Sequence, residues 1–108
     1  MVDKPRVKMP NEARKGDIVV IKTLIAHPME SGFRKDGDGK LVPRKIISHF
    51  ACSFNEQPVF ACDFEPSVSA NPYIQFTARV EGEGTFRFAW TDDDGTVFTT
   101  DQPMRLIG

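Results

Sequence analysis

Apolar and polar residues alternate along the second half of this 108-residue chain. Large apolar side chains recur at every second position over residues 74–80 and again over residues 86–90, with a Glu-Gly-Glu-Gly turn between the two runs. A period of two puts alternate side chains on opposite faces of a β-strand, so each run predicts a strand with one dry and one wet face. Helical periodicity is nearly absent, and eight prolines further disfavour helices. The pattern therefore predicts an all-β fold.

Shorter apolar runs predict the remaining strands. They cover residues 18–26, 46–54, 59–64, 96–100 and 104–107. About seven short antiparallel strands with short connections are typical of an immunoglobulin-like β-sandwich. A chain of this length fits one such domain, over residues 1–108. We expect residues 1–15 to form a loosely ordered N-terminal segment and a first strand.

Composition and charge exclude several classes of protein. No apolar run approaches the ~20 residues that a membrane-spanning helix needs. The N-terminus has positive charge but no apolar stretch of the kind found in a secretory signal peptide. Residues 1–54 contain eleven Lys or Arg against six Asp or Glu, whereas residues 55–108 contain three against nine. A basic half could attract an acidic partner, while the net charge of −1 argues against nucleic acid.

The predicted strand over residues 18–26 is apolar on both faces. One face carries Ile18, Val20, Leu24 and Ala26, and the other carries Val19, Ile21, Thr23 and Ile25. The outer face of a sandwich normally meets water, so the second apolar face requires cover. Another part of this chain could supply that cover. Our hypothesis is instead that a second polypeptide covers the face of Val19, Ile21 and Ile25.

Two similar segments, Phe-Ala-Cys-Ser-Phe at 50–54 and Phe-Ala-Cys-Asp-Phe at 60–64, place each cysteine between two phenylalanines on one face of a strand. If both segments share a face, Cys52 can lie opposite Cys62, and a disulfide becomes conceivable. The interpretation that we favour is two buried thiols that pack as small apolar groups. The sequence does not decide whether the thiols are bonded.

Candidate catalytic and metal-binding residues are few. The histidines and cysteines (His27, His49, Cys52 and Cys62) contain no Cys-x-x-Cys and no close His pair, so we predict neither a metal nor another cofactor. A small metal-binding redox module built on these four residues is the alternative. Asp36-Gly37-Asp38-Gly39 is interpreted as a hairpin tip, since Lys40 occupies the next position of a calcium-loop pattern. No nucleophile motif is present, so we do not predict an enzyme.

Four spaced elements carry a resemblance to a known family. They are His-Pro-Met at 27–29, Phe-Ala-Cys at 50–52, Asn-Pro at 71–72 and Trp-Thr-Asp-Asp at 90–93, together with the long charged stretch over residues 26–47. From about residue 18 to the C-terminus the chain resembles the SoxZ family of sulfur-oxidation proteins. It departs from the family pattern at Glu56, where a turn glycine is common, and at Phe54, where tyrosine is usual.

The resemblance implies an immunoglobulin-like fold and a non-catalytic role. The implied partner is a SoxY-like carrier whose glycine-rich C-terminal arm bears a cysteine. This chain's own C-terminus has neither a glycine cluster nor a cysteine. Other Sox enzymes would dock transiently on the complex, and the isolated chain could form a homodimer. Thiosulfate oxidation of this kind implies the periplasm, reached by export together with a signal-bearing partner.

The resemblance and the charge pattern add further residues to the predicted interface. His27 precedes a proline and therefore ends its strand in an extended conformation, and Met29 offers an adaptable apolar surface. Arg34 and Arg44 belong to the basic half of the chain. The complete predicted interface is Val19, Ile21, Ile25, His27, Met29, Arg34 and Arg44.

Overall fold

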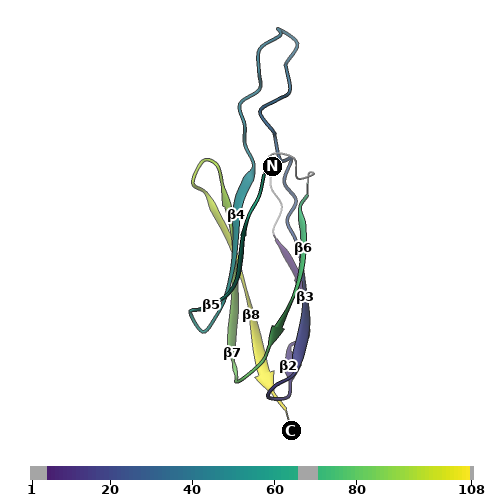
Figure 1. Ribbon diagram of the computed structural model, residues 1–108, viewed down its shortest axis with the longest axis vertical. Helices are drawn as coiled ribbons and strands as arrows, with labels where there is room; N and C mark the ends of the chain where they lie inside the picture. Colours follow the sequence, from purple (N-terminus) through teal and green to yellow (C-terminus); the bar gives the residue numbers. More distant parts are fainter. Residues whose placement is uncertain (1–4, 66–70, 108) are drawn as a thin grey trace.

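Two β-sheets lie face to face in the computed structural model of the protein (Figure 1), which describes residues 5–65 and 71–107. The first sheet has the strand order β1 (Arg6–Lys8), β3 (Ile18–Leu24), β6 (Tyr73–Arg79). The second has the order β2 (Glu12–Ala13), β8 (Val97–Leu106), β7 (Gly84–Asp92), β4 (Ile47–Phe54), β5 (Gln57–Asp63). The predicted immunoglobulin-like sandwich is confirmed. Within these described ranges, no helix could span a membrane.

Aromatic side chains fill the space between the sheets. Phe86, Phe88 and Trp90 of β7 are buried, while the intervening Arg87 is exposed, as the alternation predicts. The Phe50 ring of β4 lies 5.1 Å from Trp90. It also lies 6.0 Å from Phe76, a ring that belongs to the opposite sheet. Burying each such ring stabilises the fold by roughly 1.5–3 kcal/mol, so this layer holds the two sheets together.

The chain ends differ from the sequence-based expectation. The two strands predicted over residues 96–107 form one ten-residue strand, β8. The backbone nitrogens of Arg105 and Ile107 point toward β2. The nitrogen of Pro103 points to the same side of β8, but at a position that β2 does not reach, so no hydrogen bond is lost there. β2 pairs with β8 in parallel, an exception to the expected antiparallel pattern. Residues 6–13 contain two short strands, and residues 1–4 lie outside the described part of the chain.

Residues 30–45, here called the arm, extend beyond the sheets at the top of Figure 1. Two isolated bridges, Glu30↔Lys45 and Lys35↔Leu41, make the arm a long hairpin. The radius of gyration is 16.3 Å, against about 13 Å for a compact domain of this length. Gly39 N–H donates to Asp36 O at 3.1 Å, which confirms the predicted hairpin tip.

The β4–β5 turn requires an unusual backbone at a residue that is not glycine. Asn55 and Glu56 have φ of 49° and 71°, the pattern of a type I′ hairpin turn. Asn55 accepts a hydrogen bond from Thr85 N–H (3.0 Å) and donates one to Glu83 O (3.1 Å), so its conformation is well supported. Glu56 makes no such bond within the described chain, so its left-handed conformation is a local strain.

We predict that Glu56→Gly stabilises the protein by roughly 0.5–1 kcal/mol, because relief of the left-handed strain exceeds the added entropy of the unfolded chain. Urea unfolding of both proteins measures the difference. Glu81→Gly is the matched control, since Glu81 is exposed and has no positive φ. That control should be neutral or slightly destabilising. Equal destabilisation by the two substitutions would contradict the strain argument.

Candidate partner-binding site

The structure separates the seven predicted interface residues into two groups. Five lie inside the chain: Val19 (6% exposed), Ile21 (0%), Ile25 (0%), His27 (1%) and Met29 (6%). The assignment of a partner to the face of Val19, Ile21 and Ile25 is therefore wrong, because that face packs between the two sheets. The other sheet of this same chain covers that face, which is the alternative that the sequence left open. Arg34 and Arg44 lie on the exposed arm.

The opposite side of β3 is the exposed apolar one. Ile18 is 61% exposed and Val20 is 42% exposed, although both are strand residues with large aliphatic side chains. Paired strands extend this surface across the sheet through Tyr73 of β6, which lies opposite Leu24 and is itself exposed. The surface, here called the β3 face, consists of Arg6, Lys8, Ile18, Val20, Lys22, Leu24, Tyr73, Gln75, Thr77 and Arg79. Exposed apolar patches of this kind mark protein contacts.

Every charged side chain on the β3 face is basic. Lys8 and Lys22 are directly opposite each other in the β1–β3 pairing, an arrangement of like charges that destabilises the isolated sheet. Neither lysine forms an ion pair with another described residue, whereas Arg79 lies 3.8 Å from Glu81. The face is therefore apolar at its centre and electropositive around it. A partner with a complementary acidic and apolar surface fits it best.

A buried polar cluster joins β3 to the far end of β7. Beyond β3 the chain continues to His27, whose Nδ1 accepts a hydrogen bond from Met29 N–H at 2.9 Å. The geometry therefore assigns the ring proton to Nε2, which donates to Asp92 Oδ2 at 2.6 Å. Met29 adopts φ 52°, and its sulfur accepts a hydrogen bond from Ile47 N–H at 3.2 Å. The His-Pro-Met segment is thus held by its side chains and does more than end a strand.

The Asn-Pro segment joins the same cluster. Asn71 Oδ1 accepts a hydrogen bond from His27 N–H at 2.9 Å, and Asn71 N–H donates to His27 O at 2.7 Å. Three elements far apart in the sequence, at 27–29, 71–72 and 92–93, therefore meet at the base of the arm. In the sequence these elements lie far apart, and their spacing does not indicate that they meet. Their joint presence in the family pattern was the available signal, but it carried no information about contact.

The returning strand of the arm is fixed to the same turn. Lys45 Nζ donates to Asp92 Oδ2 at 2.9 Å, and Arg44 binds Asp93 through two hydrogen bonds of 2.8 and 3.0 Å. Burial alone raises the pKa of Asp92, yet hydrogen bonds from Lys45 and His27 outweigh burial and hold that pKa below its ordinary value of 3.8. The Arg44 guanidinium similarly lowers the pKa of Asp93. The base of the arm is therefore rigidly anchored.

The rest of the arm presents side chains to solvent. Phe33 is 78% exposed and Leu41 is 61% exposed, which is unusual for such large apolar groups. Arg34 pairs with Glu30, four residues earlier in the chain, at 2.7 Å. Lys35 and Lys40 near the tip flank Asp36 and Asp38, so the tip carries charges of both signs. An exposed aromatic ring among charged side chains on a projecting hairpin is a second surface suited to contact with another protein.

The two cysteines are free and belong to the core layer. In the β4–β5 register Cys52 lies opposite Phe60, and Cys62 lies opposite Phe50, so the thiols do not face each other. Burial raises the pKa of the Cys52 thiol to about 12. Burial, and next the charge of Asp63, raise the pKa of Cys62. Both environments disfavour the reactive thiolate.

The four residues of the alternative metal site are not gathered in one place. His27 lies at the base of the arm, while His49 contacts Asp63 at 2.7 Å on the exposed side of the β4–β5 pair. Both cysteines point inward from those two strands. Across residues 5–65 and 71–107, no group of three or more His, Cys, Asp or Glu side chains could hold a metal ion.

Two packed sheets with an exposed face on the smaller one define a β-sandwich protein of the immunoglobulin-like class. Comparison with known families then gives a specific result: the profile of the sulphur oxidation protein SoxZ matches residues 7–103. The chain belongs to the SoxZ family and is thus a component of the Sox system of sulfur oxidation. No curated protein sequence matches it significantly.

Solved structures show the same fold at low sequence identity. The superoxide reductase (neelaredoxin) from Ignicoccus hospitalis matches with a TM-score of 0.74 at 13% identity, covering 98% of this chain and 82% of that one. The sulfur carrier protein SoxY from Chlorobium limicola f thiosulfatophilum matches with a TM-score of 0.69 at 13% identity, covering 97% of this chain and 80% of that one. Identity this low supports a shared fold and no more.

We predict that Asp92→Asn lowers the free energy of unfolding near neutral pH by roughly 3 kcal/mol, because a buried, fully hydrogen-bonded charge is replaced. A depressed pKa contributes stability that is complete above pH 3.8 and is lost as pH falls through the folded-state pKa. The difference in the free energy of unfolding between Asp92→Asn and wild type should therefore become smaller in acid. Urea unfolding at pH 7 and pH 3 measures it.

Asp101→Asn is the control for this variant. Asp101 pairs with Arg87 at 2.9 Å, but both side chains are exposed, and exposed pairs contribute little. The control should be close to wild type at pH 7. An Asp92→Asn protein that unfolds like the control would contradict the role given to the buried network.

We also predict that a thiol reagent at pH 8 leaves Cys52 of the native protein unmodified and reacts slowly with Cys62. In denaturant both thiols should react at once. Thr99→Cys, which places a thiol on an exposed strand position, is the control for rapid reaction. Mass spectrometry of peptides identifies the modified site. Rapid native labelling of Cys52 would contradict the burial argument.

Proposed function

We propose that this protein is the non-catalytic partner subunit of a sulfur-carrier heterodimer. The other subunit is a SoxY-type protein that carries sulfur intermediates on a cysteine. The β3 face supports the proposal more than any other feature, because a SoxZ-family chain here exposes aliphatic side chains beside two lysines that have no ion-pair partner among the described residues. The sulfur carrier protein SoxY from Chlorobium limicola f thiosulfatophilum has the same fold, which agrees with pairing between two related sandwiches.

The properties of the thiols support a role without covalent chemistry in this subunit. A carrier thiol must be exposed and readily ionised. Cys52 is buried with a raised pKa, and burial, followed by the neighbouring Asp63 carboxylate, raises the pKa of Cys62. The intermediates would therefore be attached to the partner subunit, and this chain would stabilise that partner and supply surface for enzymes.

The arm supports the second part of this role. It projects away from the β3 face region, and its base is fixed by the Asp92 network, so it presents Phe33 and Arg34 in a defined direction. We propose that the arm contributes to transient docking of Sox enzymes on the heterodimer. Small, exposed and partly charged surfaces of this type suit short-lived contacts.

Association with the carrier subunit tests the proposal. Val20→Glu places a carboxylate at the centre of the β3 face, and should weaken the heterodimer at least tenfold, because the charge is buried without a partner on binding. Thr99→Glu, on the outer face of the other sheet, is the matched control and should bind like wild type. Co-purification and calorimetric titration with the carrier measure both. Equal binding by the two variants would exclude the β3 face.

A further inference from the structure

The edge of β3 is only partly covered by its neighbouring strand. β1 pairs with β3 through three positions, from Arg6↔Leu24 to Lys8↔Lys22. On the other edge, β6 pairs with β3 along its whole length, from Ile18 to Leu24. Among the described residues, Ile18 to Ile21 therefore have a strand neighbour on one side alone. Pro10 explains why β1 stops, since it has no N–H to continue the ladder, and the chain then crosses to the other sheet as β2.

The direction of the free backbone groups follows from the hydrogen bonds at the two ends of the β3–β6 pair. Ile25 N–H donates to Pro72 O at 3.3 Å, and Val80 N–H donates to Asp17 O at 2.8 Å. Antiparallel ladders bond at every second residue, so the odd-numbered residues of β3 face β6. The N–H and C=O groups of Ile18 and Val20 consequently point to the open edge. Neither residue has a backbone hydrogen bond from a described residue on that side.

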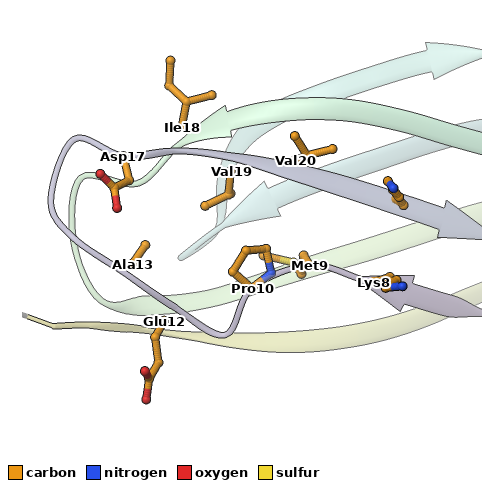
Figure 2. Close-up of a pocket in the computed structure, with 10 residues that line it drawn as sticks. Lys8, Met9, Pro10, Glu12, Ala13, Asp17, Ile18, Val19 and Val20 are labelled. Carbon is orange, nitrogen blue, oxygen red and sulfur yellow. The ribbon is translucent and has the colours of Figure 1, made fainter.

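A groove of about 640 Å³ lies along this open edge (Figure 2). Residues 9–13 form its opposite wall, where the chain crosses between the sheets. The apolar lining is Met9, Pro10, Ala13, Ile18, Val19 and Val20. The groove thus combines unpaired strand groups with an apolar wall that lies opposite them.

Charge distinguishes the two ends of the groove. Both carboxylates in its lining are engaged within the chain: Asp17 accepts a hydrogen bond from Arg14 N–H, and Glu12 pairs with Arg105. Lys8 and Lys22, which stand together at the β1 end, have no such partner among the described residues. The groove can therefore neutralise a carboxylate at that end.

We propose that this groove binds an extended segment of another polypeptide as an added β-strand. The segment pairs with the N–H and C=O groups of Ile18 and Val20, and its alternate side chains are apolar and contact Met9 and Pro10. An acidic residue of the segment lies between Lys8 and Lys22. The occupant is a terminal or loop segment with no sheet attached, because β3 of a second copy would bring its own residues 9–13 into the same space.

This site does not depend on the carrier-subunit role proposed above. It uses the backbone edge of β3, whereas the carrier contact uses the side chains of the β3 face. Tyr73→Ala separates the two, since Tyr73 lies on the β3 face and does not line the groove. It should weaken the contact with the carrier. Strand addition should tolerate it with less than a threefold loss of affinity, while Val20→Pro removes the donor on the edge.

The experiment uses the intact chain and two fluorescein-labelled seven-residue peptides that alternate valine and threonine, with a glutamate at the N-terminal or the C-terminal end. We expect one of them to bind and to slow amide exchange of Ile18 and Val20 at least tenfold. Val20→Pro should weaken binding at least tenfold. Gln75→Pro, which removes an outward N–H from the free edge of β6, is the matched control and should leave affinity within twofold.

Charge reversal supplies a readout that does not require a proline variant to fold. Lys8→Glu and Lys22→Glu should each weaken binding of the acidic peptide at least fivefold. Neither variant should bind a peptide that carries a lysine at the opposite end. Absence of binding by both peptides overturns the proposal, as does binding without protection of Ile18 and Val20. A concentration-dependent dimer that protects the same two amides would also overturn it, in favour of a second copy.

Discussion

The buried carboxylate of Asp92 is the group on which the arrangement of this molecule depends. A carboxylate without solvent is costly unless each of its oxygens accepts hydrogen bonds. Here three donors meet it: His27 Nε2 at 2.6 Å, Lys45 Nζ at 2.9 Å and Asp94 N–H at 3.2 Å. These donors come from the end of β3, the return of the arm and the turn after β7. Satisfying one charge therefore fixes three distant chain segments relative to one another.

β3 illustrates how one strand can serve the core and the exterior at the same time. Its odd-numbered side chains pack against the aromatic layer, its even-numbered side chains form the β3 face, and its free backbone groups line the groove. Open edges and apolar faces favour aggregation, and proteins limit that risk with lysines and prolines on the edge. Lys8, Lys22 and Pro10 lie where such protection is needed. The same lysines leave the edge selective for acidic segments.

The sequence predicted the strands well because alternation reports directly on the pleat of a strand. It could not assign the two faces of β3, since both are apolar and the pattern carries no sign of which faces inward. The pairing with β6 decides which face of β3 is buried. Ile21 lies opposite Phe76 and Val19 lies opposite Ala78, so these two residues share the inner face with the inward residues of β6. The register between two strands 50 residues apart is a tertiary property. For the same reason the pairing of His27 with Asp92 could not be inferred, whereas the hairpin tip of the arm, a local feature, could.

The face and the edge of β3 together have an energetic consequence. Strand addition at Ile18 and Val20 forms four backbone hydrogen bonds, each with a net contribution of about 0.5–1.5 kcal/mol. Roughly 2–6 kcal/mol corresponds to dissociation constants from tens of millimolar to tens of micromolar, centred near 1 mM, so the groove alone would hold a segment weakly and release it readily. A polypeptide whose folded body covers the β3 face would present its own extended segment at an effective concentration of the same order. The groove would then be partly occupied without any additional contact. Small changes in the segment, such as loss of its acidic residue, would shift the segment between bound and free. Side-chain recognition by the face and backbone recognition by the edge therefore suit different tasks, the first lasting association and the second reversible docking.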